Sequence, residues 1–549
     1  GMQNPYWITN RDNFINRKNR FLVSGGLNYD IEKGITLGAR AKMDYTSAIN
    51  EKKYSASTDA IFAQKYGAYY KVDVSTRQLY GDVMLNIDKY FGDFSLAATV
   101  GASIQDVNYK YYSVGGDLNS VANSFTLKNL NQANAKFDQE GYHDQGQSLF
   151  ATAQVGWQSK LYLDVTGRID WLSALAWTDT NSVAYPSVGL SAILTDLLPK
   201  NNMLTFLKLR GSYSEVGNAP PRYIAYQTYP YQSGTPTTAS TYLNTDIGPE
   251  RTKAWEMGLQ SHFWGDKVAL NVSLYKTSTY SQLFNPSLSA SSGYTSIYIN
   301  GGQVDNKGIE ISASLNQRVG PVEWNSTFTY TINRNRIKKL LKLTILSDGL
   351  TVEQDVLDLG GIGNVMSRLT EGGSIGDLYV TALRTDSHGY IDVDYVNNTV
   401  GIDENAGEKK DGWIYAGNSQ AKYTMGWRNS FSWNGLSLGF LINARVGGIG
   451  VSMTQALMDS YGTSKASADA RDAGGVMING YLVPAAQKYY QTVGTGAGSM
   501  YVYSATNVRL AELSLGYDIP VTKLVPWING LNVAFTGRNL FMFYCKAPY

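Results

Sequence analysis

The three histidines and the single cysteine are the residues best suited to metal binding or nucleophilic chemistry, and they lie far apart in the sequence. His143, His262 and His388 form no pair at ligand spacing, and Cys545 has no second thiol with which to form a disulfide or a thiolate metal site. Neither a His-Glu-x-x-His zinc motif nor a phosphate-binding loop is present. We therefore predict no catalytic residue, no metal site and no cofactor, and interpret the protein as a non-enzyme.

Tyrosines that follow Asn218 are the side chains best suited to hold a ligand. Tyr223, Tyr226, Tyr229 and Tyr231 occur within nine residues of one another, among several prolines typical of a loop. A tyrosine ring offers apolar area with a polar tip, so it can stack on a sugar ring or clamp a peptide. The alternative interpretation is that these rings pack loops against each other or against a partner protein.

The composition indicates what kind of framework positions these residues. The 549 residues include 40 tyrosines, 17 phenylalanines and 55 glycines, and the formal net charge is +2. So small a net charge indicates no preference for nucleic acid. A weakly charged chain rich in tyrosine and glycine is typical of a membrane β-barrel with aromatic girdles at its two interfaces.

Apolar and polar residues alternate with period two in many segments. In segment 160–172, Leu161, Leu163 and Val165 fall on one face, whereas Asp164 and Arg168 fall on the other. Successive side chains of a strand point to opposite faces, so such a segment predicts a strand with one apolar and one polar side. The same alternation occurs in segments 35–45, 81–88, 267–275 and 308–316.

Strand length and loop length both favour a barrel over a soluble sandwich. Many alternating segments are ten or more residues long, which a tilted strand needs to cross a bilayer, and short joins alternate with long ones, as in outer-membrane barrels. Asn434-Gly435 is a strong hairpin signal. We predict an all-β fold, a transmembrane antiparallel up-and-down β-barrel with about 16 strands. They are predicted near 20–31, 35–49, 77–91, 93–113, 147–158, 160–173, 183–195, 203–217, 252–264, 267–284, 304–318, 322–338, 417–433, 436–449, 503–519 and 530–543.

Charged side chains on the polar faces are expected to line the lumen. His262 is one polar side chain predicted to point inward. The others show no pattern that names a substrate, and we expect them to pair across the wall or to contact a plug; they are Arg40, Lys42, Asp164, Arg168, Asp170, Lys208 and Arg210.

Five segments resemble signature pieces of the SusC/RagA family of TonB-dependent transporters and occur in that family's order. They are Asn4-Pro5-Tyr6-Trp7, then 206–213 (FLKLRGSY) continuing to Val216-Gly217-Asn218, then Asn306-Lys307-Gly308-Ile309-Glu310, then 509–517 (RLAELSLGY) followed by Pro520, and Gly537-Arg538-Asn539-Leu540-Phe541. Any one of these segments would be weak evidence, but five in order over nearly the whole chain are specific.

The resemblance implies a barrel of 22 strands, an N-terminal plug domain, a TonB-binding segment before the plug, and a SusD-like surface lipoprotein as a lid. Residues 1–549 correspond to the later part of that barrel, without the plug domain and without the terminal strand, so contact with TonB would be made by the N-terminal region that is not in the chain. Sixteen strands fit as numbers six to twenty-one of 22. The implied location is the outer membrane of a Gram-negative, Bacteroidetes-like bacterium.

The family often carries a calcium-loop-like turn before the strand near 417, and this chain departs from that pattern. Residues 402–412 read IDENAGEKKDG and lack the alternating oxygen ligands of an EF-hand-like loop. We therefore expect a solvated acidic loop here and no calcium ion.

The expected function is TonB-driven import of a large nutrient, either a glycan (oligosaccharide) or a peptide, by a barrel embedded in outer-membrane lipid. Two alternatives stay open: a passive porin, and an outer-membrane enzyme with clustered Ser and His at its rim. A soluble β-rich adhesin is a weaker third.

Overall fold

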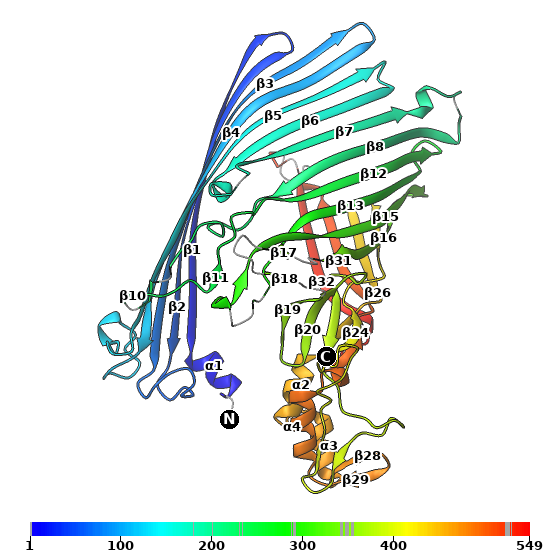
Figure 1. The fold of residues 1–549 in the computed structure, drawn as a ribbon. Helices are drawn as coiled ribbons and strands as arrows, with labels where there is room; N and C mark the ends of the chain where they lie inside the picture. The colour runs from blue at the N-terminus through cyan, green and yellow to red at the C-terminus, as the bar shows by residue number, and fades with distance from the viewer. Residues whose placement is uncertain are drawn as a thin grey trace.

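The computed structural model describes most of the chain. The described residues are 3–178, 180–199, 201–229, 231–232, 234–286, 288, 292–340, 344–345, 351–352, 356–521, 527–528 and 530–548. Within them a single large sheet of 16 antiparallel strands forms a strongly curved wall (Figure 1), and its strands pair in chain order. Both the strand number and the up-and-down arrangement confirm the sequence prediction.

The wall strands are long, and most reach or exceed the length needed to cross a bilayer. They are β1 (Asn13–Glu32), β2 (Ile35–Tyr54), β3 (Ala68–Phe91), β4 (Phe94–Asp117), β5 (Lys136–Trp157), β6 (Leu161–Leu172), β7 (Ser182–Ile193), β8 (Leu204–Asn218), β12 (Glu250–Phe263), β13 (Val268–Phe284), β15 (Ile299–Val319), β16 (Val322–Lys339), β25 (Tyr423–Trp433), β26 (Leu436–Val446), β31 (Asn507–Ile519) and β32 (Leu531–Cys545).

Strand register gathers the polar residues on one face of the wall and the apolar residues on the other. Arg40 of β2 lies directly opposite Asp82 of β3, and Ala39 lies opposite Val83. Because directly opposite residues share a face, each strand adds to the same polar or apolar row. The alternation read from the sequence therefore becomes a wall with a polar lumen side and an apolar lipid side.

Short turns join the strands at one end of the wall, and longer loops join them at the other. The hairpin between β25 and β26 has only Asn434 and Gly435 at its tip, both with positive φ (52° and 83°). Such a two-residue turn matches the twist of the paired strands, and Asn-Gly is its preferred sequence. This sorting of turns and loops agrees with periplasmic and extracellular ends, respectively.

Several strands extend farther toward the loop end than the sequence predicted. β2 continues to Tyr54, β3 begins at Ala68, and β5 begins at Lys136 rather than near 147. The outer parts of β2 and β5 carry polar residues on both faces, as in Glu51-Lys52-Lys53. In β3 the polar residues Lys71, Asp73 and Ser75 lie on the face that is apolar in the rest of the strand, so the alternation of the wall does not continue there. These strands are predicted to project above the bilayer, and the loops between them are shorter than expected.

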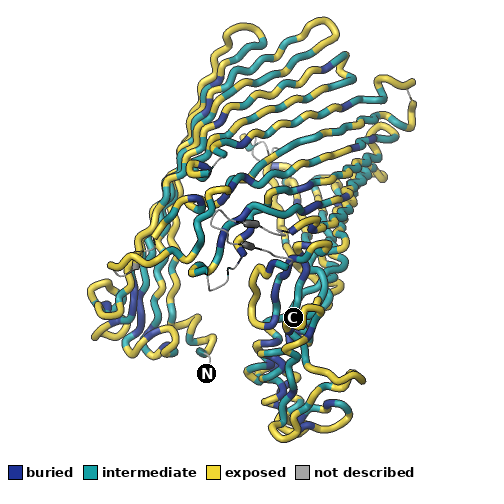
Figure 2. The backbone as a smooth tube through the Cα atoms, in the orientation of Figure 1, coloured by how far each residue is buried: buried dark blue, intermediate teal, exposed yellow. Residues whose placement is uncertain are grey.

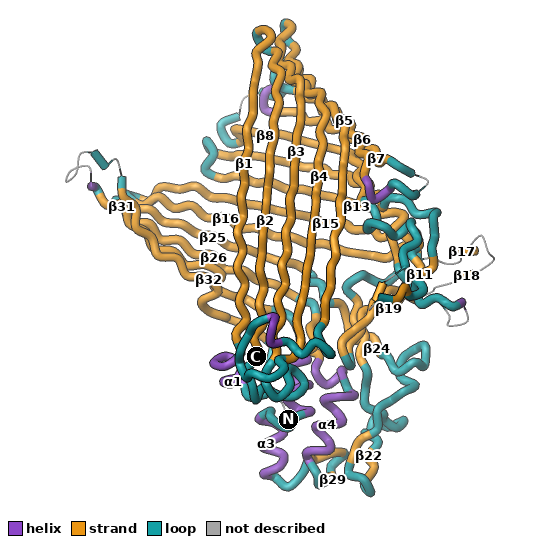
Figure 3. Tube along the Cα trace, turned by 90° about the vertical axis from the view of Figure 1, so that its left-hand side faces the viewer, coloured by secondary structure: helices purple, strands orange, loops and turns teal. Residues whose placement is uncertain are grey.

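Two of the longest loops fold together into one unit, which we call the paired-loop module (residues 356–422 and 447–506). A four-stranded sheet in the first loop, β19 (Val356–Ile362), β20 (Val365–Thr370), β21 (Asp377–Val380) and β24 (Ile414–Asn418), accompanies three helices in the second, α2 (Met453–Ser460), α3 (Lys465–Asp472) and α4 (Ala486–Gly496). Figure 3 shows these helices gathered at the loop end of the wall, which is at the bottom of that view. The sequence predicted only a long loop between the strands near 436–449 and 503–519, and the structure shows that this loop contains three helices.

The module has a hydrophobic core of its own, which contains Val400, Ile478, Val483, Val493 and Tyr501. Figure 2 shows buried residues concentrated in this module and near the loop ends of the strands, whereas the wall alternates between intermediate and exposed. The wall is therefore a surface on both sides, and the module is a small globular unit.

Short elements complete the described chain. They are α1 (Pro5–Arg11), the 3₁₀ turns η1 (Leu127–Asn129), η2 (Ser173–Leu175), η3 (Leu194–Asp196) and η5 (Gly498–Tyr501), and the strands β9 (Tyr231–Gln232), β10 (Thr235–Pro236), β11 (Thr241–Tyr242), β14 (Ser296–Ile297), β17 (Thr344–Ile345), β18 (Thr351–Val352), β22 (Val393–Asp394), β23 (Thr399–Val400), β27 (Ile449–Val451), β28 (Val476–Ile478), β29 (Tyr481–Val483) and β30 (Val502–Ser504). Among the described residues, no helix has the length and apolar character that crossing a membrane requires.

Candidate ligand site at the mouth of the barrel

Two of the four predicted tyrosines pack against an aromatic residue from a neighbouring loop. The ring centroid of Tyr226 lies 4.8 Å from that of Trp177, which follows β6, and the ring of Tyr223 lies 6.4 Å from it. These are ordinary distances for aromatic pairs. The structure therefore brings Tyr223 and Tyr226 together, and it supports the packing interpretation for part of their surface.

Arg222 anchors this loop to the inner side of the wall. Its guanidinium lies 3.6 Å from the ring centroid of Tyr142 and donates to Asp144 at 2.7 Å. Tyr142 in turn stacks on Tyr109, with centroids 4.8 Å apart. The hydrogen bond to Asp144 raises the pKa of Arg222. Asp82 belongs to the polar lumen face of the wall, and Ser103 of β4 lies directly opposite it. Tyr109 is six residues along β4 from Ser103 and so shares its face. The anchor therefore lies on the lumen side.

A small pocket lies between this loop and the loop that contains β14. Its volume is 240 Å³, and Tyr223, Tyr226, Tyr242 and Tyr298 contribute to its lining together with Thr228. A two-residue parallel bridge between β11 and β14 holds the two loops side by side. Rings and hydroxyl groups therefore face one small space at the mouth of the barrel.

The other two predicted tyrosines are not part of that pocket lining. Tyr229 is 66% exposed and Tyr231 is 73% exposed. Tyr231 begins the two-residue strand β9, which pairs with β10 in a small hairpin. Sequence reasoning did not single out Arg222, Trp177, Tyr242 or Tyr298; the Arg-Tyr sequence at 222–223 was visible, but its partners lie in other loops.

Charged residues on the lumen side pair mainly with each other. Arg40 donates to Asp82 at 2.9 Å, and that carboxylate is fully buried. Arg168 pairs with Asp170 at 2.6 Å and Arg210 pairs with Glu256 at 3.3 Å. Of the two expected roles, pairing within the wall is confirmed for these three arginines, and contact with a plug stays a prediction.

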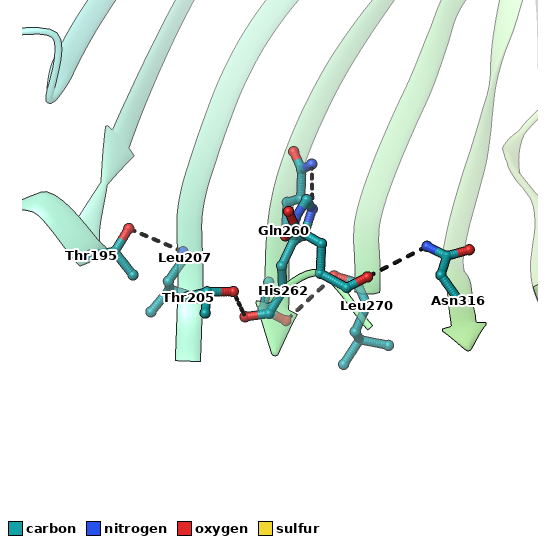
Figure 4. A network of polar contacts seen from close by, with 9 residues as sticks. Thr195, Thr205, Leu207, Gln260, His262, Leu270 and Asn316 are labelled. Carbon is teal, nitrogen blue, oxygen red and sulfur yellow. Dashed lines mark hydrogen bonds and ion pairs between the residues drawn. The ribbon is translucent and has the colours of Figure 1, made fainter. Parts of the chain in front are cut away.

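His262 belongs to a polar network at the turn end of β12. Its Nδ1 lies 2.7 Å from Oδ1 of Asp266, and its Nε2 lies 3.2 Å from the side-chain nitrogen of Gln260. Figure 4 shows this network, in which Thr205 donates to the backbone oxygen of His262. These contacts fix the β12–β13 turn, so His262 serves as a structural polar group, as the alternation predicted.

Comparison with known proteins decides the family. The family described as TonB dependent receptor-like, beta-barrel matches residues 2–356. The protein is a member of this TonB-dependent receptor family. The motif-based resemblance to SusC/RagA transporters is thus confirmed at the level of family and fold, and the family is one of the outer membrane.

Individual relatives of the receptor are distant in sequence. TonB-dependent receptor P3 of Formosa agariphila is 24% identical over 84% of this chain and 47% of its own length, and receptor P26 of the same organism is 22% identical over 96% and 55%. The chain spans about half the length of these curated relatives. The solved structure of the RagAB peptide transporter has the same fold, with a TM-score of 0.77 and 19% identity over 99% of this chain and 60% of that one.

At least one carboxylate of the acidic segment 402–412, that of Asp411, has a structural role in the receptor. Asp411 pairs with Arg368 of β20 at 2.7 Å, and Arg368 also pairs with Asp358 at 2.7 Å. Burial lowers the pKa of Arg368, but the two carboxylates outweigh this effect and raise it overall. Within the described residues, no group of three or more His, Cys, Asp or Glu side chains is arranged to hold a metal ion.

Two Gly-x-Ser-x-Gly segments, 372–376 and 435–439, occur in the receptor. A nucleophile elbow places such a serine on a sharp turn between a strand and a helix. Here Ser374 follows β20 and donates to Asn335 at 3.1 Å, and Ser437 lies inside the wall strand β26, opposite Ser432. Neither segment has the geometry of an elbow.

Proposed function

We propose that this receptor imports a glycan or a peptide too large for passive pores across the outer membrane of a Gram-negative bacterium of the Bacteroidetes type. Transport is driven by TonB, and a SusD-like surface lipoprotein covers the mouth. The barrel is the conduit and performs no covalent chemistry. Family membership supports the first part of this proposal, and the RagAB structures, described as a peptide importer, support the second by analogy of fold.

The observation that carries the proposal is the tyrosine-lined pocket at the mouth. Arg222 fixes the loop to the lumen side through Tyr142 and Asp144, and this anchoring supports a position of Tyr223 and Tyr226 on the path of an arriving ligand. Rings with hydroxyl tips next to Thr228 suit a ligand with alternating apolar and hydrogen-bonding surfaces. Sugar rings and extended peptides both have such surfaces.

The test is purification of the full-length receptor from native outer membranes in detergent, with mass spectrometry of all that co-elutes. We expect a stoichiometric surface lipoprotein and a bound oligosaccharide or peptide. A receptor carrying Tyr223→Ala and Tyr226→Ala should retain the lipoprotein but lose most of the bound ligand. Tyr481→Ala, at the exposed first residue of β29 in the paired-loop module, is the matched control.

A receptor that elutes without a lipoprotein would remove the lid from the proposal. Uptake of the identified ligand that continues in cells without TonB would contradict active import and favour a passive pore. Retention of the ligand by the double tyrosine variant would remove the pocket as its binding site.

A further inference from the structure

A groove runs across the lipid-facing surface of the wall between β1 and β6. Register places Gly25, Ala41, Gly81 and Ile104 in one row of that surface. The row nearer the turn end contains Leu27, Ala39, Val83 and Ala102, by the same pairings. The glycines and alanines at the centre of the two rows have no side chain or a small one, so the surface is hollowed there. The hollow has a volume of 1080 Å³ and is bordered by Leu149 and Trp171.

The groove continues toward the loop end of the strands. A second hollow of 750 Å³ shares Gly25, Ala41, Gly81 and Ile104 with the first. Ser24, Lys42 and Tyr80, which alternate to the lumen face, also border this hollow. Its further lipid-facing lining changes from apolar side chains to polar ones, in the order Val23, Met43 and Leu79, then Arg77, Asp106 and Gln145. One continuous depression is therefore apolar at one end and polar at the other.

The change in character falls at the expected outer edge of the hydrocarbon layer. Phe91, Phe94 and Trp157 meet at the turn end of β3, β4 and β5 and form an aromatic girdle there. Ile104 lies ten residues along β4 from Phe94, which is the length that a tilted strand needs to cross the bilayer. Arg77 therefore stands at the level of lipid headgroups, and the glycine and alanine floor lies within the acyl chains.

Arg77 is available to an anionic headgroup. His143 binds the carboxylate of Asp106 at 2.5 Å, whereas Arg77 stays 4.0 Å from that carboxylate and its side chain is 52% exposed. This distant pair is the only polar contact of Arg77 among the described residues. Lys110 lies two residues beyond Asn108, which pairs with Arg77, and it adds positive charge on the same face.

We propose that this groove binds a phosphate-bearing lipid of the outer leaflet. Its acyl chains lie over Gly81 and Ala41, and its phosphate accepts hydrogen bonds from Arg77. A second barrel packed against the same surface would bury Arg77 against an apolar wall, at a large desolvation cost. An amphiphile instead matches both ends of the groove.

The test reconstitutes the full-length receptor in phosphatidylcholine nanodiscs containing diphosphorylated lipid A or its dephosphorylated form. Lipid A that stays with the receptor after transfer to detergent is counted by mass spectrometry. We expect about one diphosphorylated molecule per receptor. Gly81→Leu fills the groove and should reduce retention by about tenfold. Gly167→Leu is the matched control, because Gly167 is on the same face of β6 outside the groove, and a side chain added there meets open space.

Arg77→Gln isolates the headgroup contact. Loss of a charge-assisted hydrogen bond should reduce retention of the diphosphorylated lipid by about tenfold and leave the dephosphorylated lipid unchanged. Lys71→Gln, on the same face of β3 but paired with Asp73 at 2.9 Å, should have no effect. Equal retention by the Gly81 and Gly167 variants would overturn the proposal. So would a change from dimer to monomer in Gly81→Leu without lipid loss, which would assign the groove to a second copy of the chain.

Discussion

The mouth loop and the paired-loop module stand at the same end of the barrel but are stabilised in different ways. The mouth loop, residues 219–229, is fixed by a few aromatic and ionic contacts around Arg222 and Trp177, and its tyrosines stay largely exposed. The module instead buries Val493 and Tyr501 in a core and links its two loops through Asn364 and Gly494.

This difference indicates a division of labour. A segment with few buried apolar contacts opens at low free-energy cost and can adjust to a ligand. A segment with a core holds one shape. We therefore interpret the mouth loop as the adaptable ligand surface and the module as a rigid rim beside it. Three substitutions test this contrast, and hydrogen exchange of the full-length receptor in detergent is the common measurement.

The largest effect is expected in the module core. Tyr489 of α4 is only 9% exposed. Tyr489→Ala removes this buried ring and should reduce the free energy of local unfolding by about 3–5 kcal/mol. Exchange should accelerate throughout both loops of the module and not in the wall. Tyr481→Ala removes a ring that is 69% exposed and should change exchange little. Faster exchange confined to α4 would show that the two loops do not fold as one unit.

An intermediate effect is expected at the buried arginine of the module. Asp411→Asn removes one of two carboxylates bound to Arg368 and should cost about 1–2 kcal/mol, because Asp411 is partly exposed. Burial is the largest single influence and would raise the pKa of Asp411, but the hydrogen bond and charge of Arg368, together with backbone hydrogen bonds, outweigh burial and depress this pKa below its usual 3.8. The stabilisation is therefore complete above pH 3.8 and is lost as the pH falls through the folded-state pKa.

The difference in exchange between Asp411→Asn and the unmodified receptor should thus stay constant from neutral pH down to about pH 5. Below pH 3.8 it should shrink. Glu408→Gln, at an exposed position of the same segment, is the control. A difference that grows in acid would contradict the role of the ionised carboxylate.

The smallest effect is expected in the mouth loop. Trp177→Ala removes the ring that holds Tyr223 and Tyr226, and an aromatic pair contributes about 0.5–1.5 kcal/mol. Exchange of residues 219–229 should accelerate by about two- to tenfold, with no change in the module. Tyr229→Ala should leave exchange unchanged. Equal protection of the mouth loop and the module in the unmodified receptor would remove the contrast altogether.

The wall could be predicted from the sequence because its signals are local. Leu161, Leu163 and Val165 alternate with polar residues wherever the strand lies between lipid and lumen, and Asn434-Gly435 specifies its own turn. Beyond the expected bilayer this signal disappears in β2 and β5 and reverses its faces in β3, so the outer parts of these strands were missed. The candidate ligand site was predicted only in part, since the partners of Tyr223 and Tyr226 come from other loops.

The module could not be predicted for a related reason. Helices α2 and α3 have eight residues each, too few to show a helical period clearly. Ala456 of α2 is buried in a core that includes Val400 of the other loop. In the sequence, Asp411 looked like one of several acidic residues of a solvated segment. Its partner Arg368 lies in β20, far from it along the chain, so the ion pair leaves no local signal. The SusD-like lid, the TonB contact and the ligand stay predictions.

The interlocked core of the module also constrains how this protein reaches its native state. Val400 belongs to the loop before β25 and Val493 to the loop after β26, so the core joins segments on either side of a complete hairpin. Seven of the eight buried residues of this core come from the second loop, and the first loop contributes Val400 and the partly buried Leu383, Ile391, Val393 and Ile402. We therefore expect the complete core to close only after both loops have reached the cell surface. A chaperone or assembly machine that handles the chain in the periplasm would have to keep Val400 and Val493 apart until the β25–β26 hairpin is inserted.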